Sequence, residues 1–126
     1  MLVSKDPRKS PPAHLKARQD FLRVQGRGKR FTSQWVLVFV APSPTDKVRV
    51  GYTVSRKVGN AVVRNHVRRR LREIIRLERE KLDGGFDYVL MALPRSKNAA
   101  FQALQSELIC LLERIHQVLQ LSSSSG

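Results

Sequence analysis

Basic residues between positions 56 and 72 are the part of this sequence best suited to chemistry, and the chemistry is the binding of anions. The segment has no acidic residue and contains seven Lys or Arg residues: Arg56, Lys57, Arg64, Arg68, Arg69, Arg70 and Arg72. Apolar residues recur through it at helical spacing, at Val63, Val67, Leu71 and Ile74. The pattern therefore predicts a packed helix that carries positive charge, rather than a disordered basic tail.

The polar face of this predicted helix is almost purely basic. At about 100° per residue, one arc of about 140° holds Arg64, Asn65, Arg68, Arg69, Arg72 and Arg76. His66 and Arg70 lie on the flanks of this arc. Like charges four residues apart repel each other, so a solvated helix usually mixes the two signs. The repulsion makes sense if a polyanion covers the face; the alternative is a face that is basic only for solubility.

The start of the predicted helix suits a phosphate group. Gly59 and Asn60 precede it, and either can serve as the N-cap, Asn60 through its side-chain oxygen and Gly59 through its backbone freedom. The first-turn amides would then lie beside Arg56 and Lys57, at the positive end of the helix dipole. The spacing of a Walker A loop is absent, so we do not expect nucleoside triphosphate binding.

The stretch from Arg56 to Glu73 closely resembles the signature helix of the protein subunit of bacterial ribonuclease P. In that family a Gly-x-Ala-Val sequence precedes an Arg-Asn-Arg core. Here Gly59-Asn-Ala-Val62 precedes Arg64-Asn65-His66, so a histidine replaces the last arginine. His66 is interpreted either as a flanking surface residue or as a direct RNA contact.

Upstream, residues 15–24 are similar to the first helix of the same family. Phe21 matches the aromatic residue of that helix, and Gln25 stands where family members often have a second aromatic residue. The resemblance implies that Phe21 stacks on a base of the bound RNA. A phenylalanine in the hydrophobic core is the equally weighted alternative. We expect Tyr52 to pack against the sheet, and the alternative is that its ring faces the central cleft of the family.

The resemblance implies a function for the whole chain. In this family an RNA subunit, using Mg²⁺ held mainly by RNA, cleaves precursor tRNA to free the mature 5′ end, and the protein assists by binding. The residues expected to contact the catalytic RNA, the ribonuclease P RNA, are Arg64, Asn65, Arg68, Arg69 and Arg72. The residues expected to hold the 5′ leader and its phosphates are Phe21, Arg56, Lys57, Gly59 and Asn60.

We expect neither a catalytic residue nor a metal ligand in the protein itself. His14, His66 and His116 are scattered along the chain, and no carboxylates pair in a motif. The acidic residues that follow the basic run alternate with Arg and Lys, which predicts ion pairs on the helix surface and its following loop. They are Glu73, Glu78, Glu80, Asp83 and Asp87.

Two other classes of protein share some of these features. A structural RNA binder of the ribosomal-protein type has the same small size and basic charge, but does not require the Gly-Asn-Ala-Val-x-Arg-Asn arrangement. A DNA-binding helix-turn-helix module needs a short helix and a tight turn before its recognition helix, and here a strand pattern precedes the basic helix.

Composition agrees with a nucleic-acid partner. The chain has 126 residues, enough for one domain, with net charge +14 and pI near 11.3. Cys110 is the one cysteine, which excludes an intrachain disulfide, and its leucine-rich surroundings predict a semi-buried structural thiol. No apolar run reaches membrane-spanning length. We expect a cytoplasmic protein with no membrane association and no evident need for a protein partner.

The sequence predicts an α+β fold with a small mixed sheet backed by helices. A flexible basic leader (1–12) precedes a single RNA-binding domain (13–121) and a flexible tail (122–126). The expected elements are a helix over about 13–24, a loop at 26–30, strands at 35–41 and 48–54 joined as a hairpin, a helix over about 61–81, a strand at 88–93 and a helix over 99–121.

The resemblance implies a ribosomal-protein-like arrangement of these elements, with a left-handed strand-helix-strand crossover. General experience with parallel strands would predict the right-handed form, which holds in about 98% of such connections. The handedness is therefore an expectation from the resemblance alone.

Overall fold

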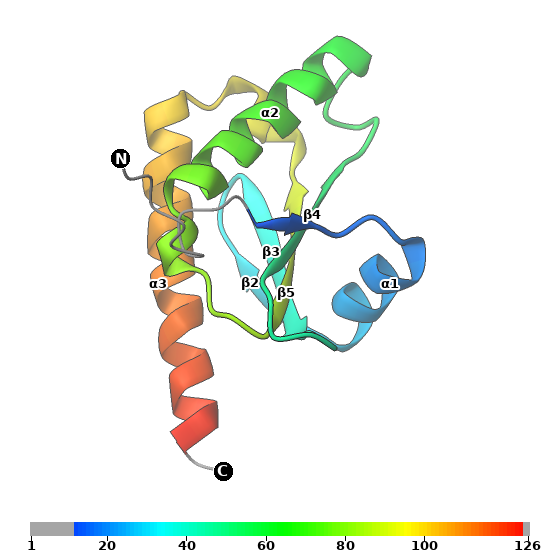
Figure 1. Ribbon diagram of the computed structural model, residues 1–126. Helices are drawn as coiled ribbons and strands as arrows, with labels where there is room; N and C mark the ends of the chain where they lie inside the picture. Colours follow the sequence, from blue (N-terminus) through cyan, green and yellow to red (C-terminus); the bar gives the residue numbers. More distant parts are fainter. Residues whose placement is uncertain (1–11, 125–126) are drawn as a thin grey trace, which may run out of the picture.

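The computed structural model describes residues 12–124, in which helices cover both faces of a five-stranded sheet (Figure 1). In chain order the elements are β1 (Ala13–His14), α1 (Arg18–Arg27), β2 (Lys29–Thr32), β3 (Val36–Pro42), β4 (Arg49–Val54), α2 (Ala61–Leu77), the 3-10 helix η2 (Arg79–Lys81), β5 (Phe86–Ala92), the 3-10 helix η3 (Pro94–Asn98) and α3 (Phe101–Ser124). The α+β class predicted from the sequence is confirmed.

The sheet is mixed, with strand order β1-β4-β5-β3-β2. β4 runs parallel to both β1 and β5, whereas β3 is antiparallel to β5 and β2. β5 lies in the middle and is buried along most of its length. Helix α2 joins the neighbouring parallel strands β4 and β5, which is the strand-helix-strand connection that the resemblance implies; its hand stays a prediction.

The hairpin expected between residues 35–41 and 48–54 is wrong. β5, which is distant in sequence, lies between β3 and β4 and pairs with both. A strand buried on both faces needs a neighbour at each edge to satisfy its backbone hydrogen bonds, and β5 is the strand that obtains two long neighbours.

The true hairpin joins β2 to β3, and β2 includes residues that the sequence analysis assigned to a loop. Lys29 to Thr32 pairs antiparallel with residues 37–40. Only Phe31 of this edge strand is buried, so the strand carries too little apolar patterning to stand out in the sequence. The hydroxyl of Ser33 stabilises the turn, because it accepts a hydrogen bond from the Val36 amide at 3.1 Å.

The ends of several elements also differ from expectation. α1 begins at Arg18 rather than near residue 13, because Ala13 and His14 form a parallel edge strand beside β4. α2 ends at Leu77 and a 3-10 turn completes the segment to Lys81. α3 continues to Ser124, so the expected tail is helical over residues 122–124. The rest of the tail, and the leader except Pro12, lie outside the described residues.

Two hydrophobic clusters hold the helices against opposite faces of the sheet. The larger lies between one face and helices α2 and α3, and includes Leu71, Ile74 and Tyr88. The smaller lies between α1 and the other face, and includes Val24, Phe39 and Val89. The alternation of side chains along the strands assigns each residue to one of these clusters. Helix α1 therefore lies across the sheet from α2 and α3 (Figure 1).

The prediction of a semi-buried Cys110 is wrong, because its side chain is exposed. On α3 the buried stripe passes through Leu108, Leu112 and Ile115. Cys110 lies two positions from Leu108 and Leu112, about 200° around the helix from each. It therefore lies on the outer side of α3 despite its leucine-rich surroundings.

Candidate nucleic-acid interface

The N-terminus of α2 combines a defined cap with uncompensated positive charge. Of the two expected candidates Asn60 is the N-cap, and its Oδ1 accepts a hydrogen bond from the Val63 amide at 3.0 Å. The amides of Ala61 and Val62, at the first two helical positions, have no partner within the helix. The first turn contains no acidic residue. This helix end can therefore attract an anion.

Gly59 lets the preceding loop lie directly against the first turn of α2. A Cβ atom at this position would come within 2.8 Å of Cγ1 of Val63. The Gly59 carbonyl oxygen accepts a hydrogen bond from Nε of Arg64 at 3.2 Å, which ties the loop to the helix. Arg56 and Lys57 are exposed on the same loop. The structure thus brings the predicted phosphate-binding residues, apart from Phe21, to one end of α2.

The five residues predicted to contact catalytic RNA lie together along α2. Asn65, Arg69 and Arg72 are exposed, and Arg64 and Arg68 are half-buried. Arg68 donates a hydrogen bond from Nη1 to Oδ1 of Asn65 at 2.8 Å. Among residues 12–124, none of the four arginines has a carboxylate within ion-pair distance. We call these five residues, Arg64, Asn65, Arg68, Arg69 and Arg72, the arginine face.

The charge of the arginine face is bounded by two other arginines that the fold engages. Arg70 donates a hydrogen bond to the carbonyl oxygen of Ala99 and so ties α2 to the start of α3. Arg76 pairs with Glu73 through two hydrogen bonds, of 3.1 and 2.6 Å. Free positive charge is therefore concentrated over the first three turns of α2. His66 is exposed on the flank, so both interpretations of it stand.

Arg72 is anchored at the edge of the sheet by Tyr52. Its guanidinium carbon lies 5.8 Å from the centre of the Tyr52 ring, within the range of a cation–π interaction. Tyr52 is half-buried against the larger hydrophobic cluster, and burial raises the pKa of its hydroxyl. Its ring therefore packs on the α2 side of the sheet, which agrees with the first of the two interpretations given above.

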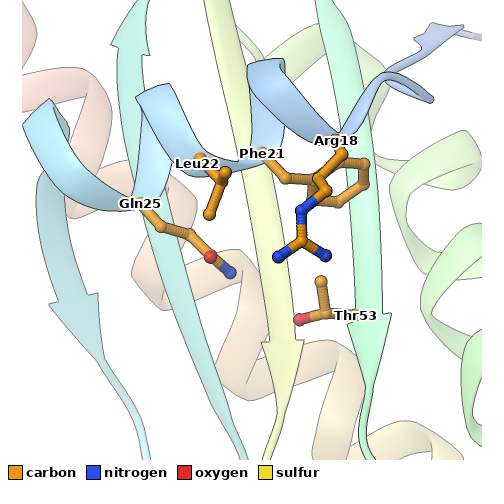
Figure 2. A pocket seen from close by; sticks show the side chains of 5 residues that line it. All are labelled: Arg18, Phe21, Leu22, Gln25 and Thr53. Carbon is orange, nitrogen blue, oxygen red and sulfur yellow. The ribbon is translucent and has the colours of Figure 1, made fainter.

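A second surface lies on the opposite side of the sheet, beside α1. There Arg18, Phe21, Leu22, Gln25 and Thr53 line a cavity of about 320 Å³ (Figure 2). We call it the α1 cavity. Its floor belongs to β4, and its wall is the exposed side of α1. Thr53 and Arg56 are three residues apart, so their Cα atoms are at most roughly 11 Å apart. The cavity therefore adjoins the loop that carries Arg56 and Lys57, which we call the basic loop.

Phe21 contributes to this cavity and to the core at once. Its ring lies against Gly51, where a Cβ atom would come within 2.5 Å of the ring atom Cζ. It packs against the smaller hydrophobic cluster and remains half-buried. The two interpretations of Phe21 are therefore compatible in the structure. Sequence reasoning did not single out Gly51. The signal that could have found it is a glycine inside a β-branched strand, which often marks the close approach of another group.

Asp87 is the acidic residue whose placement differs most from expectation. It is fully buried in β5, rather than paired on the helix surface or its loop. Arg49 donates two hydrogen bonds to its carboxylate, at 2.9 and 2.7 Å, and Arg23 of α1 donates another. Burial alone would raise the pKa of Asp87, but these arginines hold it below its ordinary value. The carboxylate thus fastens α1 to the sheet.

The other acidic residues agree better with the surface prediction. Glu73 pairs with Arg76, Glu78 lies 3.4 Å from Nζ of Lys81, and Asp83 lies 2.8 Å from Nδ1 of His116. Glu80 has no ion pair among the described residues. Within residues 12–124, no three His, Cys, Asp or Glu side chains gather as metal ligands. In the same part of the chain, no helix has the length and apolarity needed to cross a bilayer.

The fold and the two surfaces together define a class: a small basic α+β protein that presents an arginine-lined helix on one side of its sheet and a partly apolar cavity on the other. Known proteins of this class match the chain. A sequence profile of the family described as Ribonuclease P covers residues 10–116.

Individual relatives agree with the profile. The ribonuclease P protein component of Chloroflexus aurantiacus is 41% identical over 101 residues, which cover 79% of this chain and 75% of that protein. The protein component of Gluconacetobacter diazotrophicus is 45% identical over 96 residues, which cover 75% of this chain and 83% of the relative.

Solved structures resemble the chain in the same way. The RNase P protein from Thermotoga maritima superposes with a TM-score of 0.73 at 30% identity, over 80% of this chain and 96% of that one. The Staphylococcus aureus RNase P protein gives a TM-score of 0.75 at 26% identity, over 81% and 94%. The chain therefore belongs to the family of ribonuclease P protein components. Such a component has a role in tRNA processing, within an endoribonuclease complex, as a partner of ribonuclease P RNA.

Proposed function

We propose that this protein binds the catalytic RNA of ribonuclease P through the arginine face and the 5′ leader of precursor tRNA through the α1 cavity and the basic loop. In this way it assists removal of the leader and formation of the mature tRNA 5′ end. The observation that carries the proposal is the arginine face itself, four arginines without a carboxylate partner among the described residues. Crowded phosphates of a folded RNA supply the missing countercharge, and their neutralisation releases counterions.

In this proposal the leader binds along a path from the α1 cavity to the start of α2. The loop with Arg56 and Lys57 connects β4, which supplies the floor of the α1 cavity, to the capped start of α2. A single strand that stacks a base on Phe21 can therefore pass its phosphates to this loop and to the first-turn amides. Arg56, Lys57, Gly59 and Asn60 act here as phosphate ligands or as the framework that positions them.

The reaction chemistry belongs to the RNA in this proposal. Mg²⁺ prefers carboxylate oxygens and water, and the described residues of this chain form no cluster of such ligands. Residues 12–124 therefore offer no set of three protein ligands around which a Mg²⁺ ion could be held by the protein alone. We propose that the RNA holds the Mg²⁺ and that the site residues of the protein act only by binding. A cytoplasmic location is part of the same proposal.

Cleavage of a 5′-extended precursor tRNA by a bacterial ribonuclease P RNA tests the proposal. At low, near-physiological Mg²⁺, the wild-type protein is expected to stimulate cleavage at the mature 5′ end. The double variant Arg64→Ala, Arg68→Ala should lose the stimulation while keeping its circular dichroism spectrum. The double variant Arg95→Ala, Arg114→Ala removes the same charge from exposed positions on η3 and α3, and should keep the stimulation.

The family match argues against a structural RNA binder of the ribosomal type, and tight RNA binding without stimulated cleavage would contradict the proposal. A helix-turn-helix DNA binder fits less well, because α2 follows β4 and a loop rather than a helix and a tight turn. Duplex DNA should compete for binding only at concentrations typical of nonspecific association.

A further inference from the structure

We infer that Tyr52 is a positioning residue for RNA binding, which holds the guanidinium of Arg72 ready for a phosphate without neutralising its charge. The inference rests on the proposed function and goes further, because it assigns a role in RNA affinity to a residue outside the arginine face. An exposed arginine side chain loses rotamer freedom when it binds a ligand, and a contact that orders it beforehand reduces that loss. Tyr52 therefore raises the affinity without a contact of its own to the RNA.

Three arginines of the arginine face form a row along α2, and each is held by a neutral group. Nε of Arg64 donates a hydrogen bond to the carbonyl oxygen of Gly59, and Nη1 of Arg68 donates one to the side-chain oxygen of Asn65. Arg72, four residues further along, lies over an aromatic ring instead. Like charges at this spacing repel each other. Neutral partners hold the row in place against the repulsion and leave its charge for a polyanion, whereas carboxylate partners would cancel that charge.

The Tyr52 ring is fixed by contacts with the core and with β1, so it offers Arg72 a rigid surface. It is half-buried and packs against the larger hydrophobic cluster. The pairing of β1 with β4 places His14 opposite Val50, and therefore on the same face of the sheet as Tyr52. The centres of the His14 and Tyr52 rings lie 6.3 Å apart at an interplanar angle of 53°, a tilted arrangement that aromatic pairs favour. A ring held in this way does not have to be ordered when the RNA binds.

Electrostatics agree with a contact between the guanidinium and the ring. The guanidinium carbon of Arg72 lies 5.8 Å from the centre of the Tyr52 ring, and arginine stacks on aromatic faces more often than lysine does. Burial raises the pKa of the Tyr52 hydroxyl, and the positive charge of Arg72 acts against this rise. The hydroxyl is therefore neutral near pH 7 and leaves the charge of the guanidinium uncompensated.

Arg69 provides a comparison on the same helix. It is exposed, and within residues 12–124 its side chain has no hydrogen bond, ion pair or ring contact. The RNA itself must order this side chain on binding. Arg69 should therefore contribute to the salt dependence of RNA binding as Arg72 does, but its contribution should not depend on Tyr52.

A double-mutant cycle tests the inference, with affinity for ribonuclease P RNA measured by filter binding. Tyr52→Leu should lower the affinity by about two- to fivefold, the range expected for one cation–π contact. Combined with Arg72→Ala the same change should have no further effect, because the side chain to be positioned is absent. Combined with Arg69→Ala it should again lower the affinity by about two- to fivefold.

The salt dependence separates positioning from the loss of a charge. Tyr52→Leu should leave the slope of log affinity against log salt at its wild-type value, because every guanidinium remains. Arg72→Ala should lower that slope by about 0.7–0.9 if Arg72 neutralises one phosphate.

Two matched variants and one measurement on the wild-type protein separate positioning from a general loss of packing. Tyr52→Phe keeps the ring and should recover the wild-type affinity. Trp35→Leu removes another half-buried ring from the same hydrophobic cluster, and should lower stability but not RNA affinity. In the free wild-type protein, the ring current of Tyr52 should shift the Hδ proton resonances of Arg72 relative to those of Arg69. This NMR measurement does not depend on whether Tyr52→Leu folds.

Three results would overturn the inference. They are an unchanged affinity for Tyr52→Leu, an equal loss with and without Arg72, and equal Hδ shifts for Arg72 and Arg69. An equal loss in both backgrounds would mean that Tyr52 contacts the RNA directly. Each of these results leaves the proposed function intact if the wild-type protein binds the RNA subunit and stimulates cleavage. If the wild-type protein does not bind the RNA subunit, the proposed function fails and the inference fails with it.

Discussion

Arginines on the two sides of the sheet have opposite surroundings. On the α1 side, Arg23 and Arg49 both donate hydrogen bonds to the buried carboxylate of Asp87, and each also approaches Asp20. On the α2 side, the arginines of the arginine face have no carboxylate partner among the described residues. Residues of the same type therefore hold the fold together in one region and remain available to a polyanion in the other.

Neutralisation, rather than the number of arginines, separates the structural arginines from those that we propose to bind RNA. A guanidinium already paired with a carboxylate contributes little to the field that a phosphate meets, because its charge is compensated nearby. An unpaired guanidinium releases a counterion when it binds a phosphate. Removal of the first kind should lower stability, and removal of the second kind should lower RNA affinity.

Replacement of Asp87 should show the largest effect on stability. Asp87→Ala leaves Arg23 and Arg49 without their shared carboxylate in a part-buried site, so the free energy of unfolding should fall by about 3 kcal/mol. Urea denaturation measures this change. Asp46→Ala, in the exposed loop before β4, is the matched control and should have nearly wild-type stability. A fall equal to that of the control would mean that the carboxylate does not fasten α1.

Acid should weaken the α1 side through the same carboxylate. Burial opposes the charged form of Asp87, but Arg49 and Arg23 outweigh it and hold the pKa below the ordinary value of 3.8. The unfolded chain therefore takes up this proton first as the pH falls. The contribution of Asp87 is complete above the unfolded pKa and is lost as the pH drops through 3.8 toward the lower folded pKa.

Thermal unfolding from about pH 5 to about pH 2 measures this loss. The wild-type midpoint should fall more steeply than that of Asp87→Asn, which has no carboxyl group to protonate at this position. Parallel curves for the two proteins would contradict the assignment. The comparison with the variant is needed because Glu73 titrates in the same direction. Hydrogen bonds from Arg76 also lower the pKa of the exposed Glu73 carboxyl.

Loss of the helix cap should have a smaller effect on the α2 side. Asn60→Ala removes the acceptor for the Val63 amide, so the free energy of unfolding should fall by about 1 kcal/mol. Asn60→Ser retains a capping oxygen and should recover most of that loss. Urea denaturation of the wild type and the two variants measures these free energies of unfolding. Equal stability of the Ala and Ser variants would count against a capping role.

Within α2 itself, a paired and an unpaired arginine should differ by the smallest amount. Arg69→Ala should lower the slope of log affinity for RNA against log salt by about 0.7–0.9 if Arg69 neutralises one phosphate. Arg76 already pairs with Glu73, so Arg76→Ala should change the slope less. Filter binding over a series of salt concentrations measures both. Equal changes for the two variants would show that the Glu73 partner does not reduce the contribution of Arg76.

Local patterns explain what the sequence predicted well. The helical spacing of apolar residues, the cap at Asn60 and the basic arc all depend on residues within four positions of one another. Such interactions are visible in sequence, and α2 has the start, the apolar face and the arginine face that its residues predict. The resemblance to the ribonuclease P family rests largely on the same segment.

Contacts between distant residues explain what the sequence analysis missed. The placement of β5 between β3 and β4, the contact of Arg23 with Asp87 and the fit of Phe21 on Gly51 all join separate elements. A regular strand pattern gives which face is buried, but it does not name the neighbouring strand. For the same reason Gln25 and Thr53 gave no sign in the sequence that they share a cavity.

The sequence by itself therefore determined the basic capped helix, the α+β class and the polyanionic nature of the partner, because charge and periodicity are local properties of the chain. Only the tertiary structure decided that Arg23 and Arg49 pair with Asp87 and where the cavity forms. Both depend on a carboxylate or a side chain brought from a distant strand or helix, and burial of the whole core sets those positions.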